Sequence, residues 1–225
     1  MWCVPIIDAD YIKRMEDVLR LYARPIDPME PVICLDERPV VLRGDVRVGQ
    51  SAVPGRPARV DYEYERRGTA NIFCIIEPKV GRRQTHATKN RKGPRYAAAL
   101  QKIARRYSKA RTVHLVQDNL NIHCKRTVIR VLGKQAGEAL WSRFTVHYTP
   151  MHASWLNAAE LECSLVAREC LGKRRIESMA ALRPEVAAWN RNADHNRRAI
   201  NWKFRVADAR RVFRYDGIAT SRSKH

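Results

Sequence analysis

The sequence is organised by the stretch Pro31-Val32-Ile33-Cys34-Leu35-Asp36-Glu37, a short apolar run that ends on two acidic residues. A second run of the same kind, Thr112-Val113-His114-Leu115-Val116-Gln117, ends on Asp118-Asn119. Apolar runs of this length are typical of strands buried inside a sheet. Because open α/β sheets place their functional sites at the carboxyl ends of strands, Asp36 and Asp118 are candidate site residues.

Hydrophobic periodicity and turn residues predict the elements around these two runs. We expect strands over residues 31–35, 40–48, 69–77, 112–117 and 144–148, and helices over 9–24, 94–107, 124–140, 154–171 and 178–192. Residues 49–59 predict a loop, and residues 78–93 a polar, basic connection. Three strands followed by alternating helices and strands indicate an α/β fold, with a mixed five-stranded sheet flanked by helices and an antiparallel meander of the first three strands.

The helix expected over 154–171, with Ser154 as its N-cap, contains a third candidate acid, Glu160. Glu160 borders an apolar stripe and shares its face of the helix with Asn157, three residues earlier. Glu162 lies roughly 200° around the helix from Glu160 and is expected to point elsewhere. The stripe consists of Leu156, Ala159, Cys163, Val166 and Cys170. A polar Asn-x-x-Glu pair beside a core stripe suits a metal site.

The chain is strongly basic, with 43 Lys and Arg against 23 Asp and Glu and a net charge of +20 over 225 residues. Such an excess favours a polyanionic partner, and nucleic acid is the usual one. No acidic residue lies between Glu77 and Asp118, a stretch that holds twelve basic residues. We expect this stretch to follow a DNA backbone, with Arg82, Arg83, Lys89, Arg91, Lys92 and Arg95 as the contacts. A solvated basic face is the alternative.

The remaining composition describes an ordinary globular chain. No run approaches the roughly 20 apolar residues that span a bilayer, and the N-terminus has no signal-peptide pattern, so we expect a cytoplasmic, nucleoid-associated bacterial protein. The six cysteines form no C-x-x-C pair and are expected to be small core residues rather than zinc ligands. Residues 221–225 are expected to be frayed.

Three segments of the chain resemble the catalytic blocks of insertion-sequence transposases of the IS630/Tc1/mariner group. They are Val32–Glu37, His114–His123 and His147–Glu160, the last of which includes Ser154-Trp155-Leu156-Asn157-Ala158-Ala159-Glu160. Residues 61–69 and 200–210 resemble the flanking blocks, so the resemblance runs from about residue 9 to about residue 214. The Asp-Asn-x-x-x-His and Ser-Trp-Leu-Asn-x-x-Glu blocks are specific when they occur together and in this order.

The resemblance implies a ribonuclease-H-like fold and cut-and-paste DNA transposition. It further implies two Mg²⁺ or Mn²⁺ ions held by Asp36, Asp118 and Glu160, with Asn119, His123 and Asn157 beside these ligands or in contact with phosphate. The implied partners are double-stranded DNA, as transposon ends and target, and a second copy of the chain in a homodimer. We expect a catalytic domain over residues 31–193 between an N-terminal helix and lead-in, 1–30, and a basic C-terminal extension, 194–225.

Two features depart from the family's pattern. Arg67 stands where the family usually has His, and the usual helix-turn-helix modules do not precede the catalytic domain. We therefore keep two alternatives, a catalytically silent DNA-binding remnant of a truncated transposase and a ribonuclease-H-like nuclease. Each acid taken alone also has an ordinary explanation, as a turn residue for Asp36 and Asp118 and as an exposed helix residue for Glu160. His123 could equally satisfy a backbone carbonyl, and Trp155 is expected in the core rather than under a base.

Overall fold

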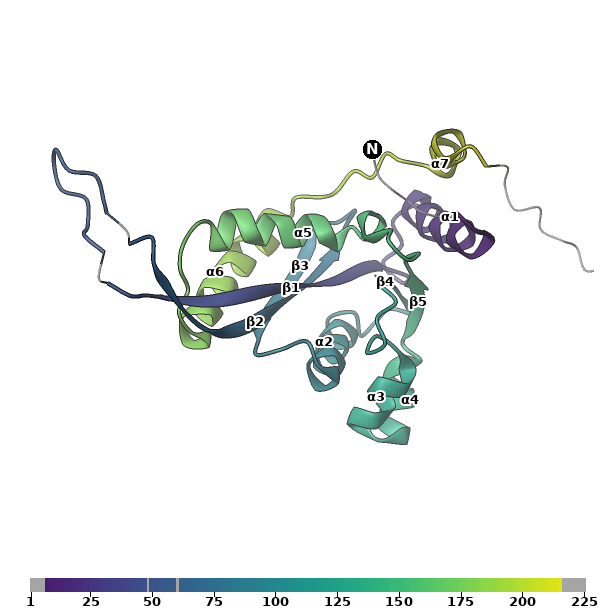
Figure 1. Ribbon diagram of the computed structural model, residues 1–225. Coiled ribbons are helices and arrows are strands. Elements are labelled where there is room, and N and C mark those ends of the chain that lie inside the picture. The colour runs from purple at the N-terminus through teal and green to yellow at the C-terminus, as the bar shows by residue number, and fades with distance from the viewer. Residues whose placement is uncertain (1–6, 48, 60, 216–225) are drawn as a thin grey trace, which may run out of the picture.

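A five-stranded mixed sheet forms the middle layer of this computed structural model, with helices on both faces (Figure 1). The structure describes residues 7–47, 49–59 and 61–215; Cys3, Val48 and the segment 221–225 considered above lie outside these ranges. The elements are α1(Ala9–Ala23), β1(Val32–Asp45), β2(Tyr64–Glu77), β3(Arg82–Thr88), α2(Gly93–Arg106), β4(Val113–Gln117), α3(Lys125–Leu132), α4(Lys134–Trp141), β5(Phe144–Tyr148), η1(Ser154–Leu156), α5(Ala159–Leu165), η2(Val166–Leu171), α6(Met179–Asn196) and α7(Val206–Phe213).

The strand order is β3-β2-β1-β4-β5, with antiparallel pairing among β1, β2 and β3 and parallel pairing of β1 with β4 and of β4 with β5. This arrangement confirms the predicted α/β class and the mixed five-stranded sheet. The first three strands form the predicted antiparallel meander, but they do not cover the residues that were expected. The expected strands over 31–35 and 40–48 are one strand, β1, and the third member is β3, within a segment we expected to lack regular structure.

Pro39 explains why two strands were expected and one is found. Proline cannot donate to a sheet ladder and is therefore tolerated mainly at strand edges. Pro39 pairs with Asn71 of β2 on one side, whereas the parallel pairing with β4 on the other side covers only Val32 to Cys34. The missing N–H of Pro39 thus removes no hydrogen bond to β4.

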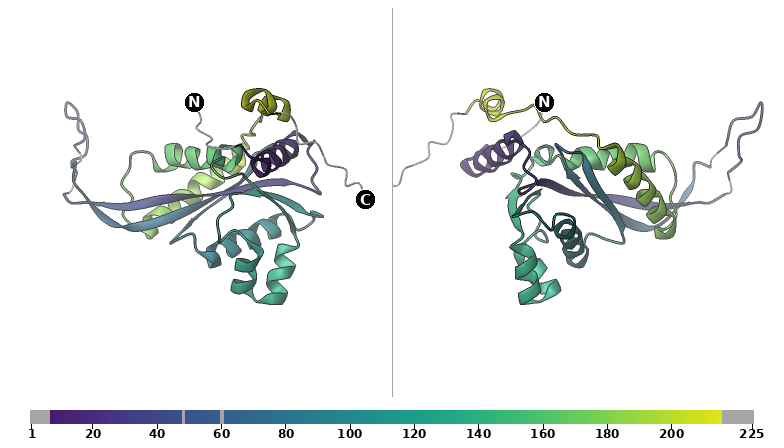
Figure 2. Two further views of the ribbon diagram at one scale, coloured as in Figure 1. Left: turned by 45° about the vertical axis from the view of Figure 1, so that its right-hand side comes forward. Right: turned by 180° about the vertical axis from the view of Figure 1, so that it is seen from behind.

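Successive side chains of β1 point to opposite faces of the sheet, and each face has its own apolar core. Ile33 and Leu35 face α2 and α3 on one side, whereas Cys34, Val40 and Leu42 face the helices on the other. The second side is covered by α1, α5, α6 and α7, as the views in Figures 1 and 2 show. Beyond the helices, β1 and β2 continue as a long two-stranded arm.

Two expected helices are interrupted. The helix expected over 124–140 is split at Gly133, whose φ of 83° ends α3 and begins α4. The helix expected over 154–171 begins as the short turn η1, is broken at Asn157, and ends as the π-helical turn η2. Asn157 has extended backbone angles and its side-chain oxygen accepts from the Ala159 N–H at 3.2 Å. Ser154 is therefore not the N-cap of a long helix, and Glu160 lies in the first turn of α5.

The C-terminal part returns across the sheet to α1. After α6 an extended segment passes the end of β2, where the Ile200 N–H donates to the Pro78 carbonyl at 2.7 Å, and it leads into α7. Glu16 on α1 accepts from Arg210 on α7 at 2.9 Å and from the Tyr215 hydroxyl at 3.3 Å. Trp155 packs edge-on against Phe204 with ring centroids 5.6 Å apart, in keeping with a core position. None of the helices in the described ranges combines the length and apolar character needed to cross a membrane.

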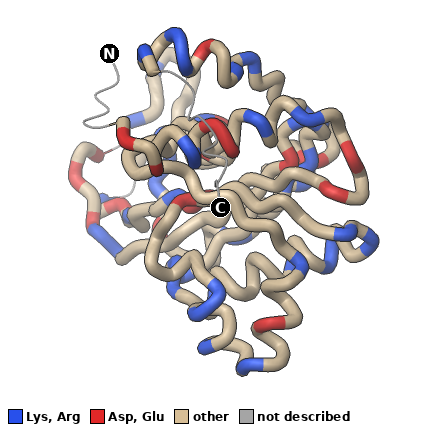
Figure 3. The backbone as a smooth tube through the Cα atoms, turned by 90° about the vertical axis from the view of Figure 1, so that its right-hand side faces the viewer, with Lys and Arg blue, Asp and Glu red and all other residues tan. Residues whose placement is uncertain are grey.

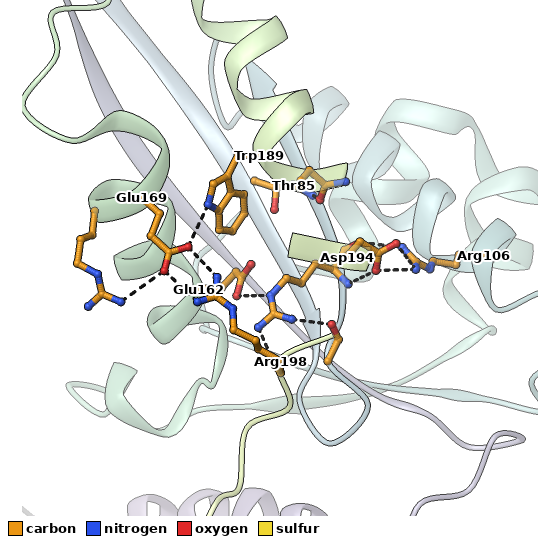
Figure 4. Close-up of polar contacts among 11 residues, drawn as sticks. Thr85, Arg106, Glu162, Glu169, Trp189, Asp194 and Arg198 are labelled. Atoms are coloured by element: carbon orange, nitrogen blue, oxygen red, sulfur yellow. Dashed lines mark hydrogen bonds and ion pairs between the residues drawn. The ribbon is translucent and has the colours of Figure 1, made fainter. Parts of the chain in front are cut away.

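A buried ion pair joins β3 to α5 and contradicts one expected DNA contact. Arg83 is 1% exposed, and its Nε donates to Glu162 Oε2 at 3.0 Å. Figure 4 labels Glu162 together with Asp194 and Arg198, two further partners of Arg83. The same guanidinium donates to the carbonyls of Gly81 and Arg198, and the Arg83 N–H donates to Asp194. A buried guanidinium with these acceptors cannot reach a DNA backbone, so the expected role of Arg83 was wrong. The expectation that Glu162 points away from Glu160 is confirmed.

Removing Glu162 should destabilise the fold. Glu162→Ala leaves the Arg83 charge buried without a counter-charge, which typically costs about 3–5 kcal/mol of unfolding free energy. The matched control is Glu185→Ala, which removes an exposed partner of Arg174 and should cost about 1 kcal/mol or less. Urea denaturation of the two variants checks this. Equal losses in both would show that burial of the Arg83–Glu162 pair contributes nothing particular.

Candidate active site

The parallel pairing of β1 with β4 brings two of the candidate acids together. Cys34 pairs with Val116, and both side chains lie in the core under α1 and α5. Asp36 and Asp118 each follow two residues later, so side-chain alternation places them on that same face, next to each other. Asp36 and Asp118 are 82 residues apart in the sequence but lie on neighbouring strands of the sheet.

Glu160 reaches the same edge from the helical layer above the sheet. Ala159 packs with Cys34 and Val116 in the core cluster beneath α1, and Cys163 packs on β1 and β2 one turn later. These contacts place the first turn of α5 over β1 near Asp36, beside the carboxyl end of β4. Asn157, which is 1% exposed, donates to the Leu35 carbonyl at 2.8 Å and lies 3.4 Å from Asp36 Oδ2.

The electrostatics of Asp36 indicate that the three acids converge. Burial raises the pKa of Asp36 to about 7, and the negative charges of Glu160, Asp118 and Glu37 act in the same direction. The Glu37 N–H, which donates to Asp36 Oδ1 at 2.7 Å, opposes this shift. Like charges that share a site raise the pKa of one of them, and a bound cation relieves this repulsion. The oxygen donors at this edge suit Mg²⁺ or Mn²⁺ in their chemistry.

The acids converge without forming a closed cage. In the described residues no group of three His, Cys, Asp or Glu side chains is close enough to hold a metal ion. Asp118 is engaged elsewhere, because its Oδ1 lies 2.5 Å from Nδ1 of His123. The fit to a metal therefore rests on the types of donor and on their common location.

His123 links Asp118 to a fourth acid, Glu37. The other ring nitrogen of His123 lies 2.8 Å from Glu37 Oε1, and both side chains are almost completely buried. The imidazole stacks on Tyr96 with centroids 4.7 Å apart. Burial alone lowers the pKa of His123, but the hydrogen bonds and charges of Asp118 and Glu37 outweigh it and raise the pKa to about 9. At neutral pH, His123 is therefore a cation that orients Asp118.

From the sequence, His123 could either lie beside the metal ligands or satisfy a backbone carbonyl, and Glu37 was not among the candidate site residues. The structure gives His123 a third arrangement, as a bridge between two carboxylates, while its own carbonyl accepts from Gln117 and Tyr148. One signal could have pointed to Glu37. It follows Asp36 directly in a strand, so it must face the opposite side of the sheet, where the predicted helix after Asp118 would meet it.

A hollow of about 380 Å³ opens beside Asp118. It is bordered by Asn119 and Leu120 after β4, by Met151 and His152 after β5, and by Arg14 of α1. Asn119 is exposed, and Met151 is 79% exposed. His152 has a φ of 59°, a conformation that costs a non-glycine residue free energy. Of the three candidate acids, Asp118 borders this hollow and is accessible from it.

The expected DNA contacts divide into paired and unpaired groups. Arg82 is half-buried and donates to Glu77 at 3.2 Å, and Arg83 belongs to the buried network described above. Lys89, Arg91, Lys92 and Arg95 are exposed around the β3–α2 connection and form no ion pair with another described residue. Figure 3 shows Lys and Arg spread over much of the tube rather than confined to this connection. Arg67, at the family's usual His position, lies on the exposed part of β2 and donates to Glu177 at 2.7 Å.

The raised pKa of Asp36 predicts a pH dependence of stability in the absence of metal. Its pKa is about 7 in the folded chain against an ordinary 3.8, so the folded state binds the extra proton. The stabilisation is present below about pH 4 and is lost as the pH rises towards 7, by at most a few kcal/mol at ~1.4 kcal/mol for each pKa unit. Urea denaturation in EDTA should show this loss in wild type relative to Asp36→Asn. Parallel curves for the two proteins would contradict it.

The bridge by Glu37 predicts a change in the titration of His123. Glu37→Gln keeps the shape of the side chain but removes one of the two negative charges, so the pKa of His123 should fall from about 9 towards its ordinary value. Imidazole NMR signals followed against pH measure this. Glu65→Gln, an exposed acid on the arm, is the control and should leave the His123 titration unchanged.

Comparison with known proteins agrees with this geometry. A family model described as DDE superfamily endonuclease matches residues 31–183. No curated protein matches the chain in sequence. Among solved structures, the chain resembles the Mos1 mariner paired end complex with Mn, with a TM-score of 0.55 and 18% identity over 85% of this chain and 58% of that one. It also resembles the Mos1 transposase paired-end complex with left transposon end, with a TM-score of 0.56 and 16% identity over 87% and 61%.

These structural likenesses concern the fold, and the chain spans about three fifths of the matched Mos1 chains. They confirm the ribonuclease-H-like fold expected from the sequence. The family model covers well over half of the chain and includes all three candidate acids. The protein is therefore a member of the DDE superfamily of endonucleases.

Proposed function

We propose that the chain is the catalytic domain of a transposase, which cleaves DNA strands and transfers their ends in a divalent-metal-dependent reaction. The convergence of Asp36, Asp118 and Glu160 at one sheet edge supports this most directly. The net charge of +20 and the exposed basic connection around Lys89 to Arg95 suit a DNA substrate. Mos1 structures with Mn, with Mg and as a strand transfer complex have the same fold.

The proposed mechanism assigns a separate task to each group. Asp36, Asp118 and Glu160 would hold two Mg²⁺ or Mn²⁺ ions, which when bound activate the attacking oxygen and stabilise the leaving oxygen. Asn157 fixes the position of the Asp36 carboxylate relative to the backbone of β1. His123, anchored by Glu37, sets the direction of the Asp118 carboxylate. Asn119, exposed at the rim of the hollow, is placed to contact phosphate.

The proposal extends to organisation and partners. Residues 31–193 contain the whole sheet and the three acids, and we assign catalysis to them; 1–30 and 194–225 would flank this catalytic part. The substrate would be double-stranded DNA, as transposon ends and as target. Joining two ends would require two active sites and hence a homodimer. Such a protein would act at the bacterial nucleoid.

Metal-dependent nicking of a supercoiled plasmid tests the proposed function. We expect nicking in Mg²⁺ and in Mn²⁺ and none in EDTA. Asp36→Asn, Asp118→Asn and Glu160→Gln should each lower the rate by about 100-fold or more, because each removes charge that positions the metals. Glu185→Gln, an exposed acid on α6, is the control and should retain the wild-type rate.

Three outcomes would contradict the proposal or change it. Wild-type nicking by any one of the three variants would remove that acid from the site. DNA binding without any nicking would favour a catalytically silent remnant. Cleavage of an RNA–DNA hybrid but not of duplex DNA would favour a ribonuclease-H-like nuclease.

A further inference from the structure

The edge of β1 beyond Asp36 is open. The pairing of β1 with β4 covers Val32 to Cys34, while β1 itself continues to Asp45. Within the described part of the chain, the stretch from Asp36 to Leu42 has a strand partner on the β2 side only. The next contact on the free edge comes at Arg43, whose N–H donates to the Ile176 carbonyl at 2.9 Å. The open edge thus begins at the catalytic acids and ends at the segment after η2.

A hollow of about 260 Å³ lies along this edge, and arginines dominate its polar lining. Arg38 and Arg43 come from β1, and Arg174 and Arg175 come from the segment after η2. No acidic side chain lines the hollow. Since a water molecule occupies about 30 Å³ of liquid, the space admits a group of several heavy atoms. Arginine side chains around such a space, above all those without an acidic partner, favour an anionic ligand.

Two of these arginines are held in place and two are available. Arg175 donates to Asp45 at 2.7 Å and to the Glu63 carbonyl, and Arg174 donates to Glu185 at 3.1 Å. By contrast, neither Arg38 nor Arg43 forms an ion pair with a described residue. The Nε of Arg38 is buried and has no hydrogen-bond partner. A buried donor without an acceptor is unfavourable, so the described residues leave part of the hydrogen-bonding capacity of Arg38 unused.

The Tyr64 ring contacts two of these arginines, Arg43 and Arg175. The Arg43 guanidinium lies over the Tyr64 ring at 4.5 Å from the centroid, and that of Arg175 lies at 5.7 Å. Stacking on one ring holds the two cations near each other despite their repulsion. A phosphate bound close to both cations would reduce their mutual repulsion.

We propose that this open edge is a phosphate-binding track, lined by Arg38, Arg43, Arg174 and Arg175, that holds the DNA backbone leading away from the catalytic acids. Arg38 lies two residues and Arg43 seven residues beyond Asp36. At about 3.4 Å for each strand residue, the track extends roughly 24 Å from the acids. This length corresponds to about seven base pairs of B-DNA. The contacts would position DNA without reading its sequence.

The inference rests on the proposed function for its substrate, but its test needs no catalysis. Binding of the full chain to a fluorescent 30-base-pair duplex of arbitrary sequence is measured by anisotropy in EDTA at several salt concentrations. Arg38→Ala/Arg43→Ala should reduce the slope of log affinity against log salt by about 2, at roughly 0.9 for each phosphate contact, and should weaken binding about tenfold near 200 mM salt.

Two controls separate the track from charge and folding effects. Arg183→Ala/Arg191→Ala removes two exposed arginines of α6 that form no ion pair with a described residue, and it should leave the slope near the wild-type value. Arg38→Lys/Arg43→Lys keeps both charges and should retain most of the slope. Circular dichroism melts of all variants verify that they are folded.

The outcomes distinguish the track from the proposed function. An unchanged slope in the folded Arg38→Ala/Arg43→Ala variant, an equal loss in the α6 control, or an absence of DNA binding by wild type would each overturn the track. If wild type binds but does not nick, a loss confined to the track variant would retain the track while the transposase proposal fails. If wild type nicks, the variant should show a raised KM for DNA and a nearly unchanged kcat, since it contains all three acids.

Discussion

The site depends on the register between β1 and β4. Because Cys34 pairs with Val116, Asp36 within β1 and Asp118 just after β4 lie next to each other on one face of the sheet. A slip by one residue would turn one of these acids to the opposite face of the sheet, where Glu37 and His123 meet. The buried side chains of Ile33, Leu35 and Leu115 on one face, and of Cys34 and Val116 on the other, fix this register through packing.

The same alternation allows one strand to serve both faces of the sheet. Asp36 faces the layer of α5, while Glu37 faces the layer of α2 and α3 and anchors His123 there. His123 then reaches from that layer to Asp118, so the orientation of one acid depends on the packing of the other core. Tyr96 on α2, stacked on His123 and bonded to Gln117, makes this link rigid.

The sequence was sufficient for features determined by neighbouring residues. The bounds of β4 and β5, the apolar stripe that contains Ala159 and Cys163, and the opposite directions of Glu160 and Glu162 follow from local periodicity, and they were predicted. The failures have long-range causes. Arg83 was expected on DNA because its partner Glu162 lies 79 residues away. β3 was missed because its buried residues Arg83 and Thr85 are as polar as its outward ones, so that its strand character depends on pairing with β2. The break at Asn157 was missed because its side chain bonds to β1 and not only to its own helix.

Internal ion pairs also determine how much of the positive charge is available to bind a polyanion. Counting basic residues selected Arg82 and Arg83, yet Glu77 and Glu162 neutralise them inside the fold. The charge available to a polyanion is the part that lacks an internal partner, and in the described residues this part includes Arg38 and Arg43 as well as the β3–α2 connection. Arg38 and Arg43 lie along the strand that presents Asp36, so unpaired positive charge begins next to the proposed catalytic acids. Near the carboxylates the metal ions would offset the repulsion of a substrate phosphate, and farther along the strand the guanidinium groups would attract the DNA backbone.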